Sequence, residues 1–213
     1  MPLNANALAL RATASTFLGI TDGDNAVVDA ETERLINTAS EIIAKRTQRI
    51  LYTLTHTQYL DGSRTDKILL KQWPITGGPA DGATKPEVFI DGKSEFGAGT
   101  EVDVDEYYVD EDIAIVMVKG SFPKGTRNIK VVYEAGYGTA AGSNIPSDLE
   151  NICLEFVQYL NQKHHDRRLG LESKGKSGES VTYELGIPTY IDAMLEPYMR
   201  RDFAASNAPV TNG

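Results

Sequence analysis

The hydrophobic pattern of this chain changes its period twice. Near the start, apolar residues recur at helical spacing over Leu35, Ile36, Ala39, Ile42 and Ile43, and later over Leu149, Ile152, Cys153, Phe156, Val157 and Leu160. Between these stretches, threonine, tyrosine and valine alternate with other residues, as in half-buried strands. The pattern predicts an α+β fold: a helical bundle formed by the N- and C-terminal helices, with a central antiparallel β-sheet or small barrel inserted.

The boundaries follow from turn and cap signals. We expect a discontinuous helical bundle over 1–49 and 138–204, a β insertion over 50–137, and a flexible tail over 205–213. Asp29 is the expected N-cap of the first long helix, and Ser147 opens a capping box with Glu150. A turn at 61–63 is expected to return the strand that starts near Ile50 into a second strand at 67–71. Further strands are expected at 87–90, 102–109, 113–118 and 128–134, a mobile loop at 170–180, and a last short helix after Pro188.

The charge of the chain is concentrated in one segment. Lysine and arginine total 21 against 30 aspartates and glutamates, a net charge of -9. Between Pro86 and Asp112 a single base, Lys93, stands against the acids Glu87, Asp91, Glu95, Glu101, Asp103, Asp105, Glu106, Asp110, Glu111 and Asp112. This segment therefore carries the whole net charge, which argues against sequence-independent binding of nucleic acid.

Several motifs have a functional and a plain structural interpretation. Residues 136–141 match G-x-G-x-x-A, but they lack the helix start and the parallel strands of a dinucleotide site. The pair His164 and His165 points in diverging directions on a helix, and Lys174 and Lys176 lie outside phosphate-loop spacing. Cys153 falls within an apolar helical stripe and is expected to be a small buried hydrophobe. We therefore expect no cofactor, no metal site and no enzymatic activity.

Other classes are constrained by absences in the sequence. The single cysteine leaves no intramolecular disulfide, and the chain lacks a signal-peptide pattern and a long apolar run. A soluble, unsecreted protein without a membrane partner is expected. The alternating acids Glu101, Asp103 and Asp105 are expected on one face of a strand, with a weak surface cation site as the alternative.

The order of these signals resembles the head-to-tail adaptor (connector, head-completion) proteins of tailed bacteriophages. The resemblance rests on motifs that occur in the family's order: Ala39, Ile43 and Arg46 on the first long helix, Val131 to Tyr137 as V-x-Y-x-A-G-Y, Ile145 to Leu149, Arg167 to Gly170, and Tyr198 to Arg201. The β segment is longer and more acidic than the family pattern.

The resemblance implies a non-enzymatic structural protein in the neck of the virion, assembled in the host cytoplasm. It implies a homo-oligomeric ring, usually dodecameric, that docks on the portal protein ring and receives the tail or a stopper protein, while DNA passes through its channel without sequence-specific binding. It further implies a C-terminal portal contact through Tyr198, Met199, Arg200, Arg201 and Phe203, and a ring or tail contact loop that contains Lys174 and Lys176.

Two alternatives remain open from the sequence. The first is a small DNA-associated phage accessory protein, similar to a replication-loading factor, whose Lys174 and Lys176 loop meets single strands. The second is a metal-dependent enzyme that uses the acidic strip of Glu101, Asp103 and Asp105. Within the adaptor interpretation this strip either lines the lumen, where it repels DNA, or docks a basic partner.

Overall fold

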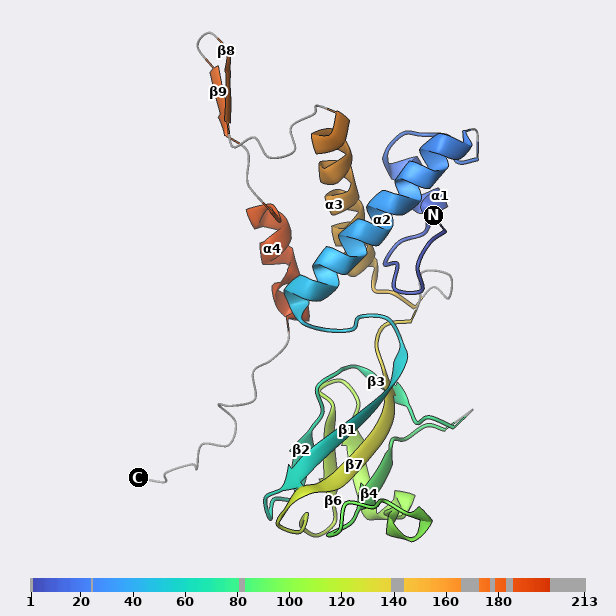
Figure 1. Cartoon of the computed structure of the whole chain (residues 1–213), viewed down its shortest axis with the longest axis vertical. Coiled ribbons are helices and arrows are strands. Elements are labelled where there is room, and N and C mark those ends of the chain that lie inside the picture. The colour runs from blue at the N-terminus through green and yellow to red at the C-terminus, as the bar shows by residue number, and fades with distance from the viewer. Residues whose placement is uncertain are drawn as a thin grey trace. The chain divides into compact units, whose positions relative to one another are not determined.

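The computed structural model describes residues 2–23, 25–80, 83–138, 144–165, 173–176, 179–182 and 186–199. The predicted α+β class and the antiparallel character of the strands are confirmed. The described residues divide into two compact units (Figure 1): a helical unit of residues 2–52 and 138–199, and a β unit of residues 53–137. Each unit has its own buried core.

The helical unit contains four α-helices from the two ends of the chain: α1 (Arg11–Phe17), α2 (Ala26–Thr47), α3 (Ser147–His165) and α4 (Thr189–Leu195). Helix α2 packs against α1 and α3, and α3 packs against α4 (Figure 1). Most residues of the two predicted stripes are buried: Leu35, Ile36, Ala39 and Ile43 on α2, and Leu149, Ile152, Cys153, Phe156 and Val157 on α3. Ile42 and Leu160, predicted on the same stripes, are half-buried. On α4, Ile191 and Leu195 are buried, but Met194, expected on the same face, is 37% exposed.

The N-caps predicted for the two long helices are displaced, whereas α4 begins directly after Pro188 as predicted. The N-cap of α2 is Asn25, whose Oδ1 accepts the Val27 N–H at 3.0 Å, so the prediction of Asp29 as the cap is wrong. The spacing of apolar residues did not reveal the first turn of α2, because Val27 in this turn is 78% exposed and does not belong to the buried stripe. Helix α3 begins at Ser147 itself, and the Pro146 carbonyl accepts the Glu150 N–H, which places the cap one residue before the expected one.

The β unit is built from seven strands in two antiparallel sheets: β1 (Leu54–Gly62), β2 (Lys67–Leu69), β3 (Ile75–Gly77), β4 (Glu87–Ile90), β5 (Tyr107–Asp110), β6 (Ile115–Val118) and β7 (Gly125–Ala135). In the four-stranded sheet, the long strand β7 pairs with β1 on one side and with β3 and β4 on the other. The three-stranded sheet has the order β2-β6-β5. Their shared core includes Leu70, Trp73, Val88, Val116, Phe122, Ile129, Val131 and Tyr133.

The predicted hairpin at 61–63 is wrong, since β1 pairs with β7 and β2 pairs with β6. Strand β1 continues to Gly62, where a Cβ would lie 1.8 Å from the Pro123 carbonyl oxygen. Asn128 holds this close approach by accepting the Gly62 N–H at 2.8 Å and donating to the same Pro123 oxygen at 2.8 Å. The glycine therefore permits a long-range contact in place of a local turn.

Three other segments differ from expectation. The strand expected at 102–109 is a 3₁₀ turn (Val104–Glu106) followed by β5, and the three-residue strand β3 was too short to show a period. The expected mobile loop at 170–180 contains β8 (Ser173–Lys176) and the start of β9 (Glu179–Thr182), which pair antiparallel with each other. A second 3₁₀ turn, Ala98–Thr100, precedes the acidic strip, and a third, Glu196–Tyr198, follows α4.

Candidate functional site

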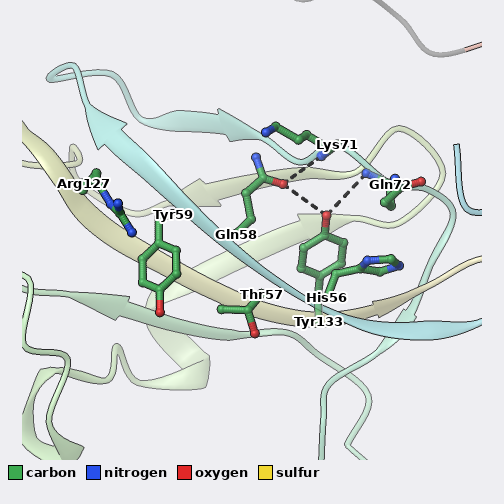
Figure 2. Close-up of a pocket in the computed structure, with 8 residues that line it drawn as sticks. All are labelled: His56, Thr57, Gln58, Tyr59, Lys71, Gln72, Arg127 and Tyr133. Carbon is green, nitrogen blue, oxygen red and sulfur yellow. Dashed lines mark hydrogen bonds between the residues drawn. The ribbon is translucent and has the colours of Figure 1, made fainter. Parts of the chain in front are cut away.

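A polar pocket of about 460 Å³ lies along strand β1 (Figure 2). Its lining residues are His56, Thr57, Gln58, Tyr59, Lys71, Gln72, Arg127 and Tyr133. Four of them are consecutive in β1, and successive side chains of a strand point to opposite faces. The pocket therefore follows the edge of β1. Lys71 and Gln72, in the segment that follows β2, line its other side.

Tyr133 is the centre of the hydrogen bonds in this pocket (Figure 2). Its hydroxyl donates to Gln58 Oε1 at 3.1 Å and accepts the Gln72 N–H at 3.3 Å, while Gln58 Oε1 also accepts the Lys71 N–H at 3.0 Å. Burial raises the pKa of Tyr133 to about 12, so the phenol stays neutral and protonated. The network satisfies buried polar groups, and it connects the four-stranded sheet to the segment that follows β2.

His56 lies beside this network, with its ring centroid 5.5 Å from that of Tyr133. Burial lowers the pKa of His56, although a hydrogen bond to the Ala135 backbone partly opposes this shift. Its Nε2 is buried and has no hydrogen-bond partner in the described part of the chain. The lining set contains no carboxylate and no cysteine, so neither a carboxylate base nor a thiol nucleophile faces His56 in this pocket.

A second hollow, of about 410 Å³, shares Tyr59 and Arg127 with the polar pocket. Here cations lie over aromatic rings: the Arg127 guanidinium is 4.8 Å from the Tyr59 centroid, and Lys130 Nζ is 4.6 Å from the centroid of Phe89. Phe96 packs against Tyr59 with the ring centroids 5.5 Å apart. We call Tyr59, Phe96, Arg127 and Lys130 the cation–aromatic patch. Its arrangement suits the recognition of carboxylates and aromatic groups.

The strands and loops of the β unit fix this patch. Tyr59 and Lys130 are paired residues of β1 and β7 and therefore lie on one face of the sheet. In the loop after β4, the Asp91 carboxylate accepts the Phe96 N–H at 2.9 Å, and Ser94 Oγ donates to the Arg127 carbonyl at 2.9 Å. Hydrogen bonds from backbone N–H groups, the first of them from Lys93, hold the pKa of Asp91 below its usual range.

The acidic strip does not form the strand face that was expected. The backbone of Glu101 forms an isolated antiparallel β-bridge with that of Phe89. The Asp103 carboxylate accepts the Asp105 N–H at 2.9 Å, and Asp105 lies within a 3₁₀ turn. All three carboxylates are exposed. The turn forms because Asp103 caps it, and this local hydrogen bond competes with a strand. Among the described residues, no group of three His, Cys, Asp or Glu side chains is arranged to hold a metal ion.

Tyr198, expected at the portal contact, is buried in the helical unit. Its hydroxyl donates to Asp148 Oδ2 at 2.5 Å, and its carbonyl accepts from Arg49 Nη1 at 3.2 Å. Met199 is half-buried. Arg200, Arg201 and Phe203 lie outside the described residues, as does the expected tail at 205–213.

The remaining predicted residues are placed as follows. Lys174 and Lys176 lie on β8, of which only the backbone is described, and the same holds for His164 and His165 at the end of α3. Cys153 is fully buried as predicted, and burial raises its pKa to about 12. Strand β7 is antiparallel to its partners and α3 begins only at Ser147, so the described residues around 136–138 lack the context of a dinucleotide fingerprint.

The sequence interpretation missed the cation–aromatic patch. The alternation of β1 and β7 could have placed Tyr59 and Lys130 on one face, had the correct pairing been known. Phe96 and Arg127 carried no such signal, because both adopt positive φ angles of 52° and 49°. Phe96 lies in the loop after β4, and Arg127 lies where the register of β7 against β1 shifts.

Comparison with known proteins identifies the family. The family model for head completion proteins matches residues 13–201, which is most of the chain and includes both units. The chain belongs to the head completion protein family. Head completion proteins are structural proteins of the virion. The match therefore confirms the structural role of head-to-tail connector that the resemblance implied.

The fold is also similar to chains of gene transfer agent (GTA) particles. One belongs to the virion of a native GTA particle, at a TM-score of 0.57 and 18% identity, covering 96% of this chain and 95% of that chain. Another is from the neck of an empty GTA particle computed with C6 symmetry, at 0.57 and 18%, covering 95% of both chains. A third is from the neck of a native GTA particle computed with C12 symmetry. Its TM-score is 0.53 and its sequence identity 18%, and the match covers 96% of this chain and 98% of that chain. No curated protein sequence matches the chain.

Within the described residues, no helix has both the length and the apolar character needed to span a bilayer.

Proposed function

We propose that this chain is a head-to-tail adaptor that forms a ring of identical subunits in the neck of a virion. The ring docks on the portal protein, receives the tail or a stopper protein, and lets DNA pass without sequence-specific binding. The observation that carries the proposal is the family match over residues 13–201. The similar chains from GTA necks computed with C6 and C12 symmetry support a ring, and we propose twelve subunits.

The helical unit has surface suited to such an assembly. Large apolar side chains are exposed on α4 and around α1: Leu10 at 40%, Phe17 at 38%, Tyr190 at 49% and Met194 at 37%. Contact with neighbouring subunits or with the portal would bury them. In this proposal the helices of both chain ends act as one bundle, and the β segment is an insertion.

The proposal includes no catalytic role for this chain. Cys153 is sealed in the helical core as a protonated thiol, and the Tyr133 hydroxyl is engaged in structural hydrogen bonds. We assign the portal contact to the C-terminal segment that includes Tyr198, Met199, Arg200, Arg201 and Phe203. Because the Tyr198 side chain is buried, its part is to anchor the end of α4 while the following residues reach the portal.

The acidic strip and the segment with Lys174 and Lys176 have proposed roles at the other contacts. Lys174 and Lys176 are assigned to a ring or tail contact. Glu101, Asp103 and Asp105 either line the lumen, where their carboxylates repel passing phosphates, or dock a basic surface.

The test is to mix the purified protein with its cognate portal and examine the product by mass photometry and cryo-EM. The proposal predicts a closed ring seated on the portal, with a mass step that matches twelve copies. A mixture in which portal particles stay bare at micromolar adaptor concentrations overturns it. Steeply salt-dependent binding to single-stranded DNA, with no portal binding, would favour a DNA accessory protein instead.

A further inference from the structure

The β unit carries two surfaces of opposite character. The first is the cation–aromatic patch of Tyr59, Phe96, Arg127 and Lys130, which lines a hollow of about 410 Å³. The second, which we call the acidic anchor patch, consists of Asp103, Val104, Asp105 and Tyr108. Its two carboxylates are exposed, and so are its apolar side chains, Val104 at 48% and Tyr108 at 58%.

The two patches do not satisfy each other within one subunit. Tyr59 and Lys130 belong to the four-stranded sheet, whereas Tyr108 belongs to β5 in the three-stranded sheet. In the described part of the chain no ion pair joins them, and the neighbouring Glu106 pairs with Lys119, at 3.8 Å. Each patch therefore keeps surface for a contact outside its own subunit.

We propose that the cation–aromatic patch of one subunit receives the acidic anchor patch of the next subunit, forming the joint between neighbouring β units in the ring. This inference rests on the proposed function, because it assigns a contact within that ring. A ring with cyclic symmetry needs two different, complementary surfaces on each subunit, so that every copy offers one and receives the other. The two patches meet this requirement in sign and in chemistry.

The chemistry favours a second copy as the occupant. The segment 86–112 carries the whole net charge of the chain, so its acidic surfaces repel each other between copies, whereas contact of an acidic surface with Arg127 and Lys130 is favourable. Glu95 also lines the hollow, but the two cations outnumber it. Tyrosine and arginine are the side chains that most often dominate interface energies, and here Tyr108 can enter a hollow bordered by Tyr59 and Arg127.

The cation–aromatic patch is already ordered for binding. Asp91 fixes the backbone of Phe96, Ser94 links that loop to Arg127, and the Arg127 N–H donates to Asp61 Oδ1 at 2.6 Å. A surface held in this way loses little conformational entropy when it binds.

The decisive experiment is site-directed cross-linking in rings assembled on the cognate portal. Thr126 is exposed and lines the hollow, and Val104 belongs to the acidic anchor patch. Two proteins, Thr126→Cys and Val104→Cys, are assembled separately and as an equal mixture, then treated with a short bifunctional maleimide. The native Cys153 is fully buried and does not react, so the background is low.

The joint predicts a cross-linked dimer in the mixture and none in rings of either variant alone. Leu54→Cys, on β1 at 41% exposure and in neither patch, replaces Val104→Cys in the control mixture and should give no dimer with Thr126→Cys. Rings that form normally but give no dimer in the first mixture overturn the joint and leave the ring itself intact. Dimers of Thr126→Cys with itself also overturn it, because they indicate two-fold pairing of like surfaces.

A charge exchange gives an independent measurement. Arg127→Glu and Asp105→Lys each place like charges at the joint, and we expect each to weaken ring assembly about tenfold, while the double variant recovers most of the loss. Failure of the double variant to recover, with both single variants folded by circular dichroism, overturns the joint. If the wild-type protein forms no ring on the portal, the proposed function itself fails.

Discussion

The helical unit and the β unit treat their charged side chains in opposite ways. In the helical unit, Arg11 lies within 4 Å of the carboxylates of Asp22, Asp29 and Glu33, and Arg46 makes a two-bond contact with Asp192, at 2.5 and 2.7 Å. In the β unit, Arg127, Lys130 and Lys85 lie over the rings of Tyr59, Phe89 and Tyr107. The carboxylates of Glu101, Asp103 and Asp105 are exposed, and none of them forms an ion pair within the described residues.

This difference separates two uses of charge. Some ion pairs in the helical unit join elements far apart in sequence, as Arg46 on α2 pairs with Asp192 on α4, and these serve the fold, while others lie within α2. The β unit is held instead by its apolar core and by neutral hydrogen bonds around Tyr133 and Asn128. Apart from the pair of Glu106 with Lys119, its charged side chains form no ion pair within the described residues and are available for contacts with other molecules.

The largest effect should come from the core of the helical unit. Phe156 is 1% exposed, and Phe156→Ala should lower the free energy of unfolding of the helical unit by about 3–5 kcal/mol, because it leaves a cavity. Far-UV circular dichroism in a urea titration reports the helices. The single tryptophan, Trp73, is buried in the core of the β unit and reports that unit by fluorescence. We expect the dichroism midpoint to move more than the fluorescence midpoint, and equal shifts would contradict separate cores.

A smaller effect is expected from the neutral network of the β unit. Tyr133→Phe removes the hydroxyl that donates to Gln58 and accepts from Gln72, which should cost about 1–2 kcal/mol. The Trp73 fluorescence midpoint in urea measures it. Tyr108→Phe is the matched control, since that side chain is 58% exposed and should leave the midpoint unchanged. If Tyr133→Phe also leaves the urea midpoint unchanged, the hydrogen bonds of the Tyr133 hydroxyl do not stabilise the β unit.

Local patterns predicted the elements of this protein better than its pairings. The stripes of α2 and α3 and the extent of β4 were readable because helix and strand periods are local properties. The pairing of β1 with β7 was not, because it depends on a close approach between Gly62 and Pro123 far along the chain. The turn at Asp103 was missed for a related reason: a side-chain cap overrode an alternating pattern of acids and valines.

The same limit applies to the candidate site. Cys153 was correctly predicted as a buried hydrophobe from one helix alone. The polar pocket and the cation–aromatic patch combine side chains from β1, β7 and two loops, and their assembly depends on tertiary pairing that a single sequence does not reveal. The family resemblance identified the role, while the surfaces that could perform it came from the structure.

The two units should also respond to acid in different pH ranges. Burial lowers the pKa of His56, so the unfolded β unit takes up a proton more readily than the folded one. The urea midpoint measured by Trp73 fluorescence should therefore fall as the pH drops from about 7.5 to about 5.5, the range in which histidine usually titrates. His56→Gln should reduce the change of the urea midpoint with pH. If the midpoint of this variant changes with pH as much as that of the wild type, His56 is not the group responsible.

In the helical unit the sensitive range lies lower. The hydrogen bond from Arg46 holds the pKa of Asp192 below its usual value, so the stability that this carboxylate contributes is present above about pH 4 and is lost as the pH falls further. Dichroism midpoints at descending pH should show this loss, and Asp192→Asn should remove it.

The smallest expected effect compares one carboxylate from each unit. Asp192→Asn breaks the exposed pair with Arg46 and should lower the stability of the helical unit slightly, less than Tyr133→Phe affects the β unit, and the effect should shrink as salt is added. Asp105→Asn keeps the backbone contact with Asp103 and removes one charge from a crowded acidic strip, so the stability of the β unit should stay the same or rise. Urea midpoints by dichroism and by Trp73 fluorescence, at low and high salt, measure the pair. Equal destabilisation by the two variants would remove the distinction between charges that serve the fold and charges that serve contacts, because Asp105 would then be stabilising its own subunit.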